Sequence, residues 1–298
     1  MNDDFRCAAA SLERAEGLVA TASVVRAFVL VECPGAWGSV ALRDARLSRA
    51  VRERLLDVSR LGVKTLLIRR HGRAAPSGGG GHLFVAWCGA RERWLETTRL
   101  ESLDDLVDLD LAAVSRGERV GLTPSSEPIF CVCTQGRHDA CCAERGRPLA
   151  AAMTRARADL TWEVSHVGGD RFAGNVVVLP EGLYYGRVTP TDAAELVTTH
   201  LGGHVDLDHL RGRSSYPLAA QAAEHHARRE LGETRLDAVR LAGVRRHADL
   251  WDVDLDVEGQ VWQVTVRARR AEPAKLTCDA LRLNGAQIFE PLTMTTVT

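Results

Sequence analysis

The stretch Cys131-Val-Cys-Thr-Gln-Gly-Arg-His-Asp-Ala-Cys-Cys142 is the most informative part of this sequence, because it holds four of the eight cysteines within twelve positions. Scattered core cysteines seldom gather so densely. The stretch leaves a predicted strand, residues 128–133, and enters a predicted helix, residues 139–156. Thiols at a helix start lie near free backbone N–H groups and partial positive charge, which lower the thiol pKa. The stretch therefore indicates a redox site or a site of sulfur ligands.

A second segment, Ser165-His-Val-Gly-Gly-Asp-Arg-Phe172, follows another predicted strand, residues 161–164. Its glycine pair lets the backbone fold closely around a ligand and brings His166 and Asp170 to one side. The two segments together supply soft sulfur, borderline nitrogen and a hard carboxylate. That mixture fits zinc or an iron–sulfur centre better than calcium or magnesium.

Hydrophobic patterning predicts the same order of elements, β-α-β-β-α, in the first two thirds of the chain. The first set consists of strand 24–31, helix 47–61, strand 63–68, a glycine-rich turn at 77–81, the hairpin strands 82–88 and 93–98, and helix 103–114. The second set consists of strand 128–133, helix 139–156, strand 161–164, the hairpin strands 175–179 and 183–188, and helix 191–201. The repeated order predicts an α/β protein with mixed sheets, built from two thioredoxin-like units in tandem.

The remainder of the chain predicts a small α+β appendage. A helix is expected over 217–231, a second helix over 237–242, and a hairpin from strands 250–257 and 260–266. The predicted domains are an N-terminal thioredoxin-like unit at 1–120, a unit with the cysteine-rich site at 121–203, and a C-terminal region at 204–298.

Composition narrows the class of protein. The chain has 298 residues, and 38 Lys+Arg against 39 Asp+Glu give a net charge of −1, which argues against a nucleic-acid-binding surface. No apolar run reaches the roughly 18 residues of a membrane span. The first residues lack the basic-then-apolar layout of a secretory signal. We therefore expect a cytoplasmic protein that binds neither membrane nor nucleic acid.

The quoted motifs resemble the sucrase/ferredoxin-like family, whose members carry a thioredoxin-like ferredoxin domain with a [2Fe–2S] cluster. The resemblance rests on five stretches, namely Glu32–Gly38, Cys133–Cys142, Arg147–Ala150, Trp162–Ala173 and Leu179–Arg187. It implies that Cys133 and Cys142 are thiolate ligands and that His166 is the first member of a second ligand pair. Bis-histidinyl members of the family have His-x-x-x-His at that pair, whereas the last position here is Asp170.

This departure leaves the fourth ligand open. Either Asp170 binds through oxygen, or it supports the site while Cys141, Cys131 or His138 completes the ligand set. A carboxylate in place of one imidazole makes the centre more negative. The expected midpoint potential then lies above that of all-thiolate ferredoxins and below that of bis-histidinyl relatives.

The resemblance implies a one-electron carrier that serves an unidentified redox partner protein, rather than a stand-alone enzyme. Two other hypotheses are a thiol–disulfide protein that uses Cys131 and Cys133, and a structural zinc site of Cys133, Cys142 and His166. The first lacks a Cys-x-x-Cys motif, and the spacing of the second is unusual for zinc.

The other cysteines have a plainer interpretation. Cys7, Cys33, Cys88 and Cys278 are expected to be small buried residues. Cys141 is expected to be structural, since adjacent cysteines on a helix do not share one face. Asp139 is expected to cap the helix that follows it.

Overall fold

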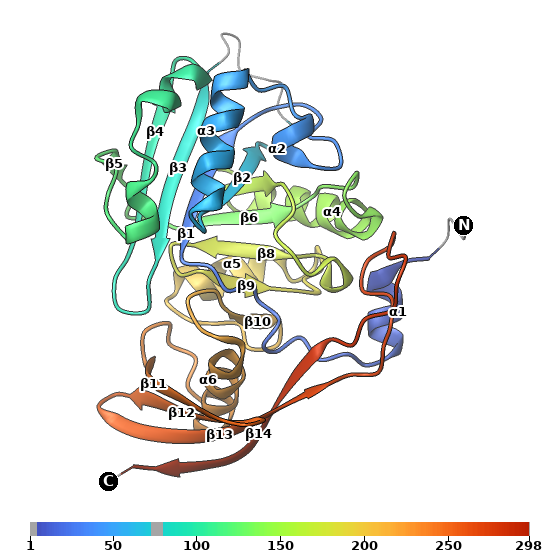
Figure 1. Ribbon diagram of the computed structural model, residues 1–298, viewed down its shortest axis with the longest axis vertical. Coiled ribbons are helices and arrows are strands. Elements are labelled where there is room, and N and C mark those ends of the chain that lie inside the picture. Colours follow the sequence, from blue (N-terminus) through green and yellow to red (C-terminus); the bar gives the residue numbers. More distant parts are fainter. Residues whose placement is uncertain (1–4, 73–79, 298) are drawn as a thin grey trace.

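Two consecutive parts of the chain, here called its first and second halves, repeat one arrangement of strands (Figure 1). A smaller sheet follows them. The computed structural model describes residues 5–72 and 80–297. The strands of the large sheet are β1 (Ala27–Glu32), β2 (Lys64–Arg69), β3 (Gly81–Cys88), β4 (Arg93–Leu100), β5 (Thr123–Pro124), β6 (Ile129–Cys133), β7 (Thr161–Val164), β8 (Val176–Leu179), β9 (Leu183–Tyr185) and β10 (Leu210–Arg213).

Helices lie between these strands and at the start of the chain. The α-helices are α1 (Cys7–Glu13), α2 (Ala41–Asp44), α3 (Arg49–Arg60), α4 (Ala140–Ala156), α5 (Ala193–Leu201) and α6 (Leu218–Leu231), and the 3-10 helices are η1 (Leu103–Asp108), η2 (Ala113–Arg116) and η3 (Asp170–Phe172). Among the described residues, no helix combines the length and the apolar character needed to cross a membrane.

The strand order shows that the two halves are equivalent. In the first half the order is β2-β1-β3-β4, with β1 and β2 parallel and the other neighbours antiparallel. In the second half the order β7-β6-β8-β9 has the same directions. Both are the arrangement of a thioredoxin-like unit, so the predicted α/β fold with two such units in tandem is confirmed.

The two units join into one continuous sheet through β2 and β7. These strands pair antiparallel over two positions, Ile68 with Val164 and Arg69 with Glu163. Because the pairing involves only the last residues of both strands, the carboxyl ends of β2 and β7 meet. The predicted domain boundaries therefore stay a prediction, since the sheet itself runs through both units.

The core lies in three layers around this sheet. Alternate side chains of a strand point to opposite faces, so Phe28 and Leu30 of β1 enter a core shared by the two units, which also holds Trp162. Figure 1 shows the strands of the first unit crossing those of the second. On the outer faces, Leu55 of α3 packs on the first unit and Leu149 of α4 on the second. Each half of the sheet is thus covered on both faces.

Two predicted helices differ in the structure. Residues 103–114 form η1 and η2 instead of one helix, because the chain becomes extended at Leu109, which lets Leu106, Leu111 and Val114 all reach the outer core. The helix expected over 237–242 is wrong, because its residues begin strand β11 and pair with β12. Pairing with β12, the next strand along the chain, overrides the local preference of so short a segment. The glycine-rich turn falls mostly, at 77–79, outside the described residues.

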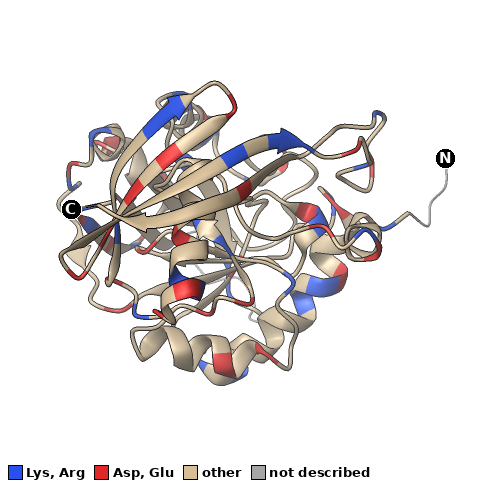
Figure 2. Ribbon diagram, turned by 90° about the horizontal axis from the view of Figure 1, so that it is seen from below, with Lys and Arg blue, Asp and Glu red and all other residues tan. Residues whose placement is uncertain are grey.

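The predicted C-terminal α+β appendage is present as a four-stranded antiparallel sheet with α6 on one face. Its strands are β11 (Val239–His247), β12 (Leu250–Val257), β13 (Gln260–Arg270) and β14 (Gln287–Thr296). Figure 2 shows basic and acidic segments side by side on this sheet, where Arg245 pairs with Asp254 and Arg269 pairs with Glu290. The segment 271–286, between β13 and β14, runs beside α1 (Figure 1).

Candidate metal centre

Strand β6 and helix α4 hold the cysteine-rich segment in a fixed turn. Asp139 caps α4 by accepting a hydrogen bond from the backbone N–H of Cys141, as predicted. Gly146 lets the helix approach the end of the strand closely, because a Cβ there would lie 2.0 Å from the carbonyl oxygen of Cys133. The turn therefore sets Cys133, at the strand end, beside Cys142, in the first turn of the helix.

The structure brings the four predicted ligands together. Ligand atoms of Cys133, Cys142 and His166 all lie within 4.8 Å of one another. Asp170 joins them, because its Oδ1 lies 3.2 Å from the Cys142 Sγ and 2.9 Å from the His166 Nδ1. The carboxylate of Asp170 is 4% exposed, so it faces these groups rather than solvent.

His138 is a fifth potential ligand at the same place. Its ligand nitrogen lies within 4.8 Å of the ligand nitrogen of His166 and of a carboxylate oxygen of Asp170. The distance between its Nε2 and the Asp170 Oδ2 is 3.8 Å. The rings of His138 and His166 face one another with centroids 3.8 Å apart. The sequence named His138 only as one alternative, and its position in the turn between β6 and α4 is the signal that places it here.

The four side chains shift one another's pKa values. Burial acts to lower the pKa of His166, but Asp170 and Cys133 outweigh burial and raise this pKa to about 9. Cys142 and His166 hold the pKa of Cys133 below its usual range, and the neighbouring Cys133 sulfur raises the pKa of Cys142. Burial acts to raise the pKa of Asp170, but His166 holds it below its usual range. The four side chains therefore interact strongly with one another.

Gln135 fastens the site to the N-terminal unit. Its Oε1 accepts a hydrogen bond of 2.7 Å from the backbone N–H of His166. Its Nε2 donates to the carbonyl oxygens of Gly38 and Ser39, which follow β1. These hydrogen bonds hold the loop between β6 and α4 against the N-terminal unit.

A buried arginine supports the second segment from behind. Arg211, 1% exposed, donates to the carbonyl oxygen of Gly168 and to the Oδ1 of Asn175. Gly169 has a φ of +81°, and a Cβ there would lie 2.2 Å from a guanidinium nitrogen of Arg211. The glycine pair is expected to let the backbone fold around a ligand; in the structure Gly169 lets it approach this guanidinium.

The remaining cysteines divide into core residues and a second group. Cys131 lies in the shared core, and burial raises its pKa well above the usual range, so it stays a thiol. Cys141 points away from Cys142 and meets Cys7, Cys278 and Asp139, whose ligand atoms all lie within 4.8 Å of one another. The sequence did not indicate this second group, because its members are far apart in the chain.

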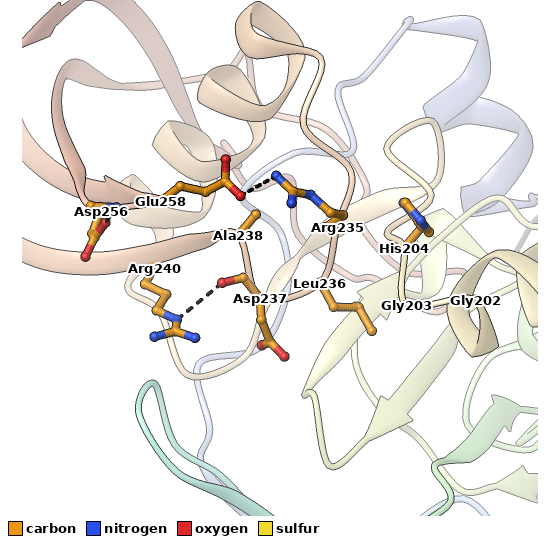
Figure 3. A pocket seen from close by; sticks show the side chains of 11 residues that line it. Gly202, Gly203, His204, Arg235, Leu236, Asp237, Ala238, Arg240, Asp256 and Glu258 are labelled. Atoms are coloured by element: carbon orange, nitrogen blue, oxygen red, sulfur yellow. Dashed lines mark hydrogen bonds and ion pairs between the residues drawn. The ribbon is translucent and has the colours of Figure 1, made fainter.

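The cavity in Figure 3 lies away from both groups. It has a volume of about 690 Å³ and is lined by residues that follow α5, precede β11 and form the turn between β12 and β13. Arg235 pairs with Glu258 at 2.7 Å across it. The described residues that line it include no cysteine, so it has no part in the candidate metal centre.

The fold and the donor groups define a tandem thioredoxin-like protein with a buried set of thiol, imidazole and carboxylate donors. The profile of the sucrase/ferredoxin-like family matches residues 18–212, which is more than half of the chain. The chain therefore belongs to the sucrase/ferredoxin-like family.

One relative is the altered inheritance of mitochondria protein 32 of Meyerozyma guilliermondii, which is 33% identical over 98 residues. The match covers 29% of this chain and 35% of that protein, so the chain spans about a third of the length of this relative.

Solved structures with a likeness to the chain include the thioredoxin-like [2Fe–2S] ferredoxin of Aquifex aeolicus, at 23% identity and a TM-score of 0.28, over 31% of this chain and 97% of that one. A cysteine-to-serine variant of that ferredoxin matches at 26% identity and a TM-score of 0.26, over 28% and 97%. The fold assignment of the present chain rests on its own strand order and strand directions.

Proposed function

We propose that this chain is an electron-transfer protein that holds a [2Fe–2S] cluster between Cys133, Cys142, His166 and a fourth ligand. The observation that carries the proposal is the convergence of two thiols, an imidazole and a carboxylate, from two separate segments, at one buried place. Membership of the sucrase/ferredoxin-like family supports it.

The donor set fits such a cluster chemically. Iron–sulfur clusters take cysteine thiolates, and histidine replaces cysteine in some [2Fe–2S] centres. His166 supplies an imidazole whose Nδ1 lies 2.9 Å from the Oδ1 of Asp170, so a nitrogen and a carboxylate donor stand beside the two thiols.

A bound cluster supplies one-electron transfer. The protein contributes the surroundings: Cys133 and Cys142 are buried, whereas the side chains of His138 and His166 are 35% and 30% exposed. The imidazole side is therefore the open side of the site. A redox partner protein is expected to dock there, and the fully buried Trp162 belongs to the core that closes the region behind Cys133.

We propose Asp170 as the fourth ligand, with His138 as the alternative that the geometry brings closest. Asp170 lies near the Cys142 sulfur as well as both imidazoles, so it touches every part of the group except Cys133. Carboxylate ligation gives an oxidised centre of about −1 charge and a lower midpoint potential than two imidazoles give.

The test is analysis of the full chain, purified anaerobically with iron and sulfide supplied. We expect about two irons and two acid-labile sulfides for each chain, visible absorbance that bleaches on reduction, and an electron paramagnetic resonance signal of the reduced state. Cys133→Ser, Cys142→Ser and His166→Ala are expected to lose the signal, while the control Cys33→Ser keeps it. A folded, colourless protein without iron would contradict the proposal, and zinc that is lost in Cys133→Ser would favour the structural zinc hypothesis.

The same spectra distinguish the fourth ligand. If Asp170 binds the metal, Asp170→Ala changes the resonance spectrum and raises the midpoint potential, whereas His138→Ala leaves both nearly unchanged. The opposite result assigns the position to His138. Unchanged spectra in both variants would exclude both residues. A pH-dependent potential is expected in either case, since an imidazole ligand can take a proton on reduction.

A further inference from the structure

The second group of donors lies on the other side of the start of α4. It consists of Cys7 in α1, Asp139 and Cys141 at the start of α4, and Cys278 in the segment between β13 and β14. Three separate parts of the chain, the beginning, the middle and the end, therefore meet at one point. The group stands apart from the proposed cluster, although Cys141 is the direct neighbour of Cys142.

The donor atoms of this group lie close together without covalent contact. The Sγ of Cys278 is 3.5 Å from that of Cys141 and 3.6 Å from that of Cys7. The Oδ1 of Asp139 is 3.0 Å from the Cys278 sulfur and 3.6 Å from the Cys7 sulfur. Two sulfurs that bind one zinc ion at about 2.3 Å each lie roughly 3.8 Å apart in a tetrahedral site. The group is thus already near the dimensions of a single-ion site.

Backbone groups hold the donors in place. The backbone N–H groups of Cys141 and Cys278 donate to the Asp139 carboxylate at 2.9 and 2.8 Å, which fixes its plane. The backbone N–H of Ala8 points at the Cys141 sulfur, with 3.5 Å between nitrogen and sulfur. Hydrogen bonds of this kind to ligand atoms orient metal ligands in proteins. Asp139 is 2% exposed, so its carboxylate is enclosed with the thiols.

We infer that Cys7, Cys141, Cys278 and Asp139 form a structural zinc site that ties α1 and the segment 271–286 to the second thioredoxin-like unit. Three thiolates and one carboxylate in a closed, four-donor arrangement suit Zn²⁺. A disulfide explains the group less well, because it joins two sulfurs and leaves the third cysteine and the carboxylate unused. The inference is independent of the proposed function, since no donor is shared between the two sites.

Zinc at this position closes very long loops. Cys7 and Cys141 are 134 positions apart, and Cys141 and Cys278 are 137 apart. A metal that joins distant parts of a chain binds the folded state only, so its binding free energy adds to the stability of the fold. The group lies in a small core formed by Cys7, Ala8, Cys141 and Ala173, with Phe5 and Cys278 packed against it.

The test is metal analysis of the full chain purified anaerobically from medium that supplies both iron and zinc. We expect one zinc for each chain in addition to any iron, and X-ray absorption at the zinc edge with about three sulfur neighbours near 2.3 Å and one oxygen. Cys278→Ser and Cys7→Ser are expected to lower zinc content at least fivefold and to leave iron content unchanged. Cys88→Ser, at a buried cysteine outside both groups, is the matched control and keeps the zinc.

Limited proteolysis gives a second measurement. Removal of zinc with a chelator, or the Cys278→Ser substitution, is expected to speed cleavage within 271–286 at least tenfold, while Cys88→Ser leaves the rate unchanged. Zinc-free wild-type protein that is folded, or zinc that persists in both Cys7→Ser and Cys278→Ser, overturns the inference. So does zinc that leaves with Cys133→Ser instead. Iron absent with zinc present contradicts only the proposed function, and the reverse contradicts only the zinc site.

Discussion

The two thioredoxin-like units have the same strand order but different side chains at the same place. The loop after β6 leads from Cys133, the last residue of the strand, to Cys142, and both face the candidate metal centre. The loop after β1 carries Cys33 and then Trp37, whose indole N–H donates to the Cys33 carbonyl oxygen at 2.7 Å. Arg69 covers the Trp37 ring at 4.2 Å. In the loop after β1, Trp37 occupies the space. At the equivalent place after β6 lie the side chains of the candidate metal centre.

This difference shows that the fold sets where a site can lie, whereas the side chains of the loop decide whether that site can bind a metal. The carboxyl ends of β2 and β7 pair at the junction of the two units. Gln135, in the loop after β6, donates a hydrogen bond to Gly38 in the loop after β1. The N-terminal unit therefore serves as one wall of the site, although its own loop presents no comparable donor group among the described residues. Substitutions on each side of the junction measure how far the two units depend on each other.

The largest expected effect comes from Gly146→Ala, which acts on the second unit only. Its Cβ would lie 2.0 Å from the Cys133 carbonyl oxygen, so α4 must move away from β6. We expect a loss of about 3 kcal/mol in unfolding free energy and a severalfold loss of bound metal, measured by denaturant titration and elemental analysis. Gly17→Ala is the control, because nothing lies within 4 Å of its added Cβ. Wild-type stability and metal content in Gly146→Ala would show that the helix does not need this close approach.

A smaller effect is expected from Glu163→Gln at the junction. The buried Glu163 pairs with Arg69 and His71, each at 2.7 Å, and accepts a hydrogen bond from Thr134. Loss of its charge is expected to lower the unfolding free energy by about 2 kcal/mol at pH 7, since Arg69 remains partly exposed.

The pH dependence of this contribution follows from the pKa of Glu163. Burial acts to raise this pKa, but His71 and Arg69 hold it below its usual range. A lowered pKa in the folded state stabilises the protein above the unfolded pKa of about 4.3, and the stabilisation is lost as pH falls through the folded value. The difference between wild type and Glu163→Gln should therefore shrink in acid. A difference that stays constant down to about pH 3, below the unfolded value, would exclude this charge effect.

The smallest expected effect is that of Trp37→Phe in the N-terminal unit. It removes the hydrogen bond to the Cys33 carbonyl oxygen but keeps an aromatic ring beneath Arg69. We expect a loss of about 1 kcal/mol in unfolding free energy, with unchanged metal content and spectra. A loss of metal comparable with that of Gly146→Ala would mean that the two loops are not independent in the way their side chains indicate.

The sequence predicted what depends on local patterns. The strand over 161–164 and the helix over 139–156 have periodic apolar residues and clear ends, and the structure has both. The family motifs predicted that His166 and Asp170 lie beside Cys133 and Cys142, and in the structure the four side chains lie close together.

What the sequence could not show depends on contacts between elements. Strand β14 and the start of β11 gain their structure by pairing with β13 and β12, which the preferences of their own residues do not encode. The β2–β7 junction has only two residue pairs and no motif of its own. Cys7 and Cys278 looked like ordinary buried thiols, because only the folded chain brings them to Cys141.

The back-to-back arrangement of Cys141 and Cys142 has a practical consequence for work on this protein. One peptide bond separates a thiol that contacts α1 and the segment 271–286 from a thiol in the proposed iron site. A truncation that removes α1 deletes the Cys7 sulfur from this group, and one that removes the segment 271–286 together with β14 deletes the Cys278 sulfur. Potentials and spectra obtained on shortened versions therefore describe a different molecule from the intact one.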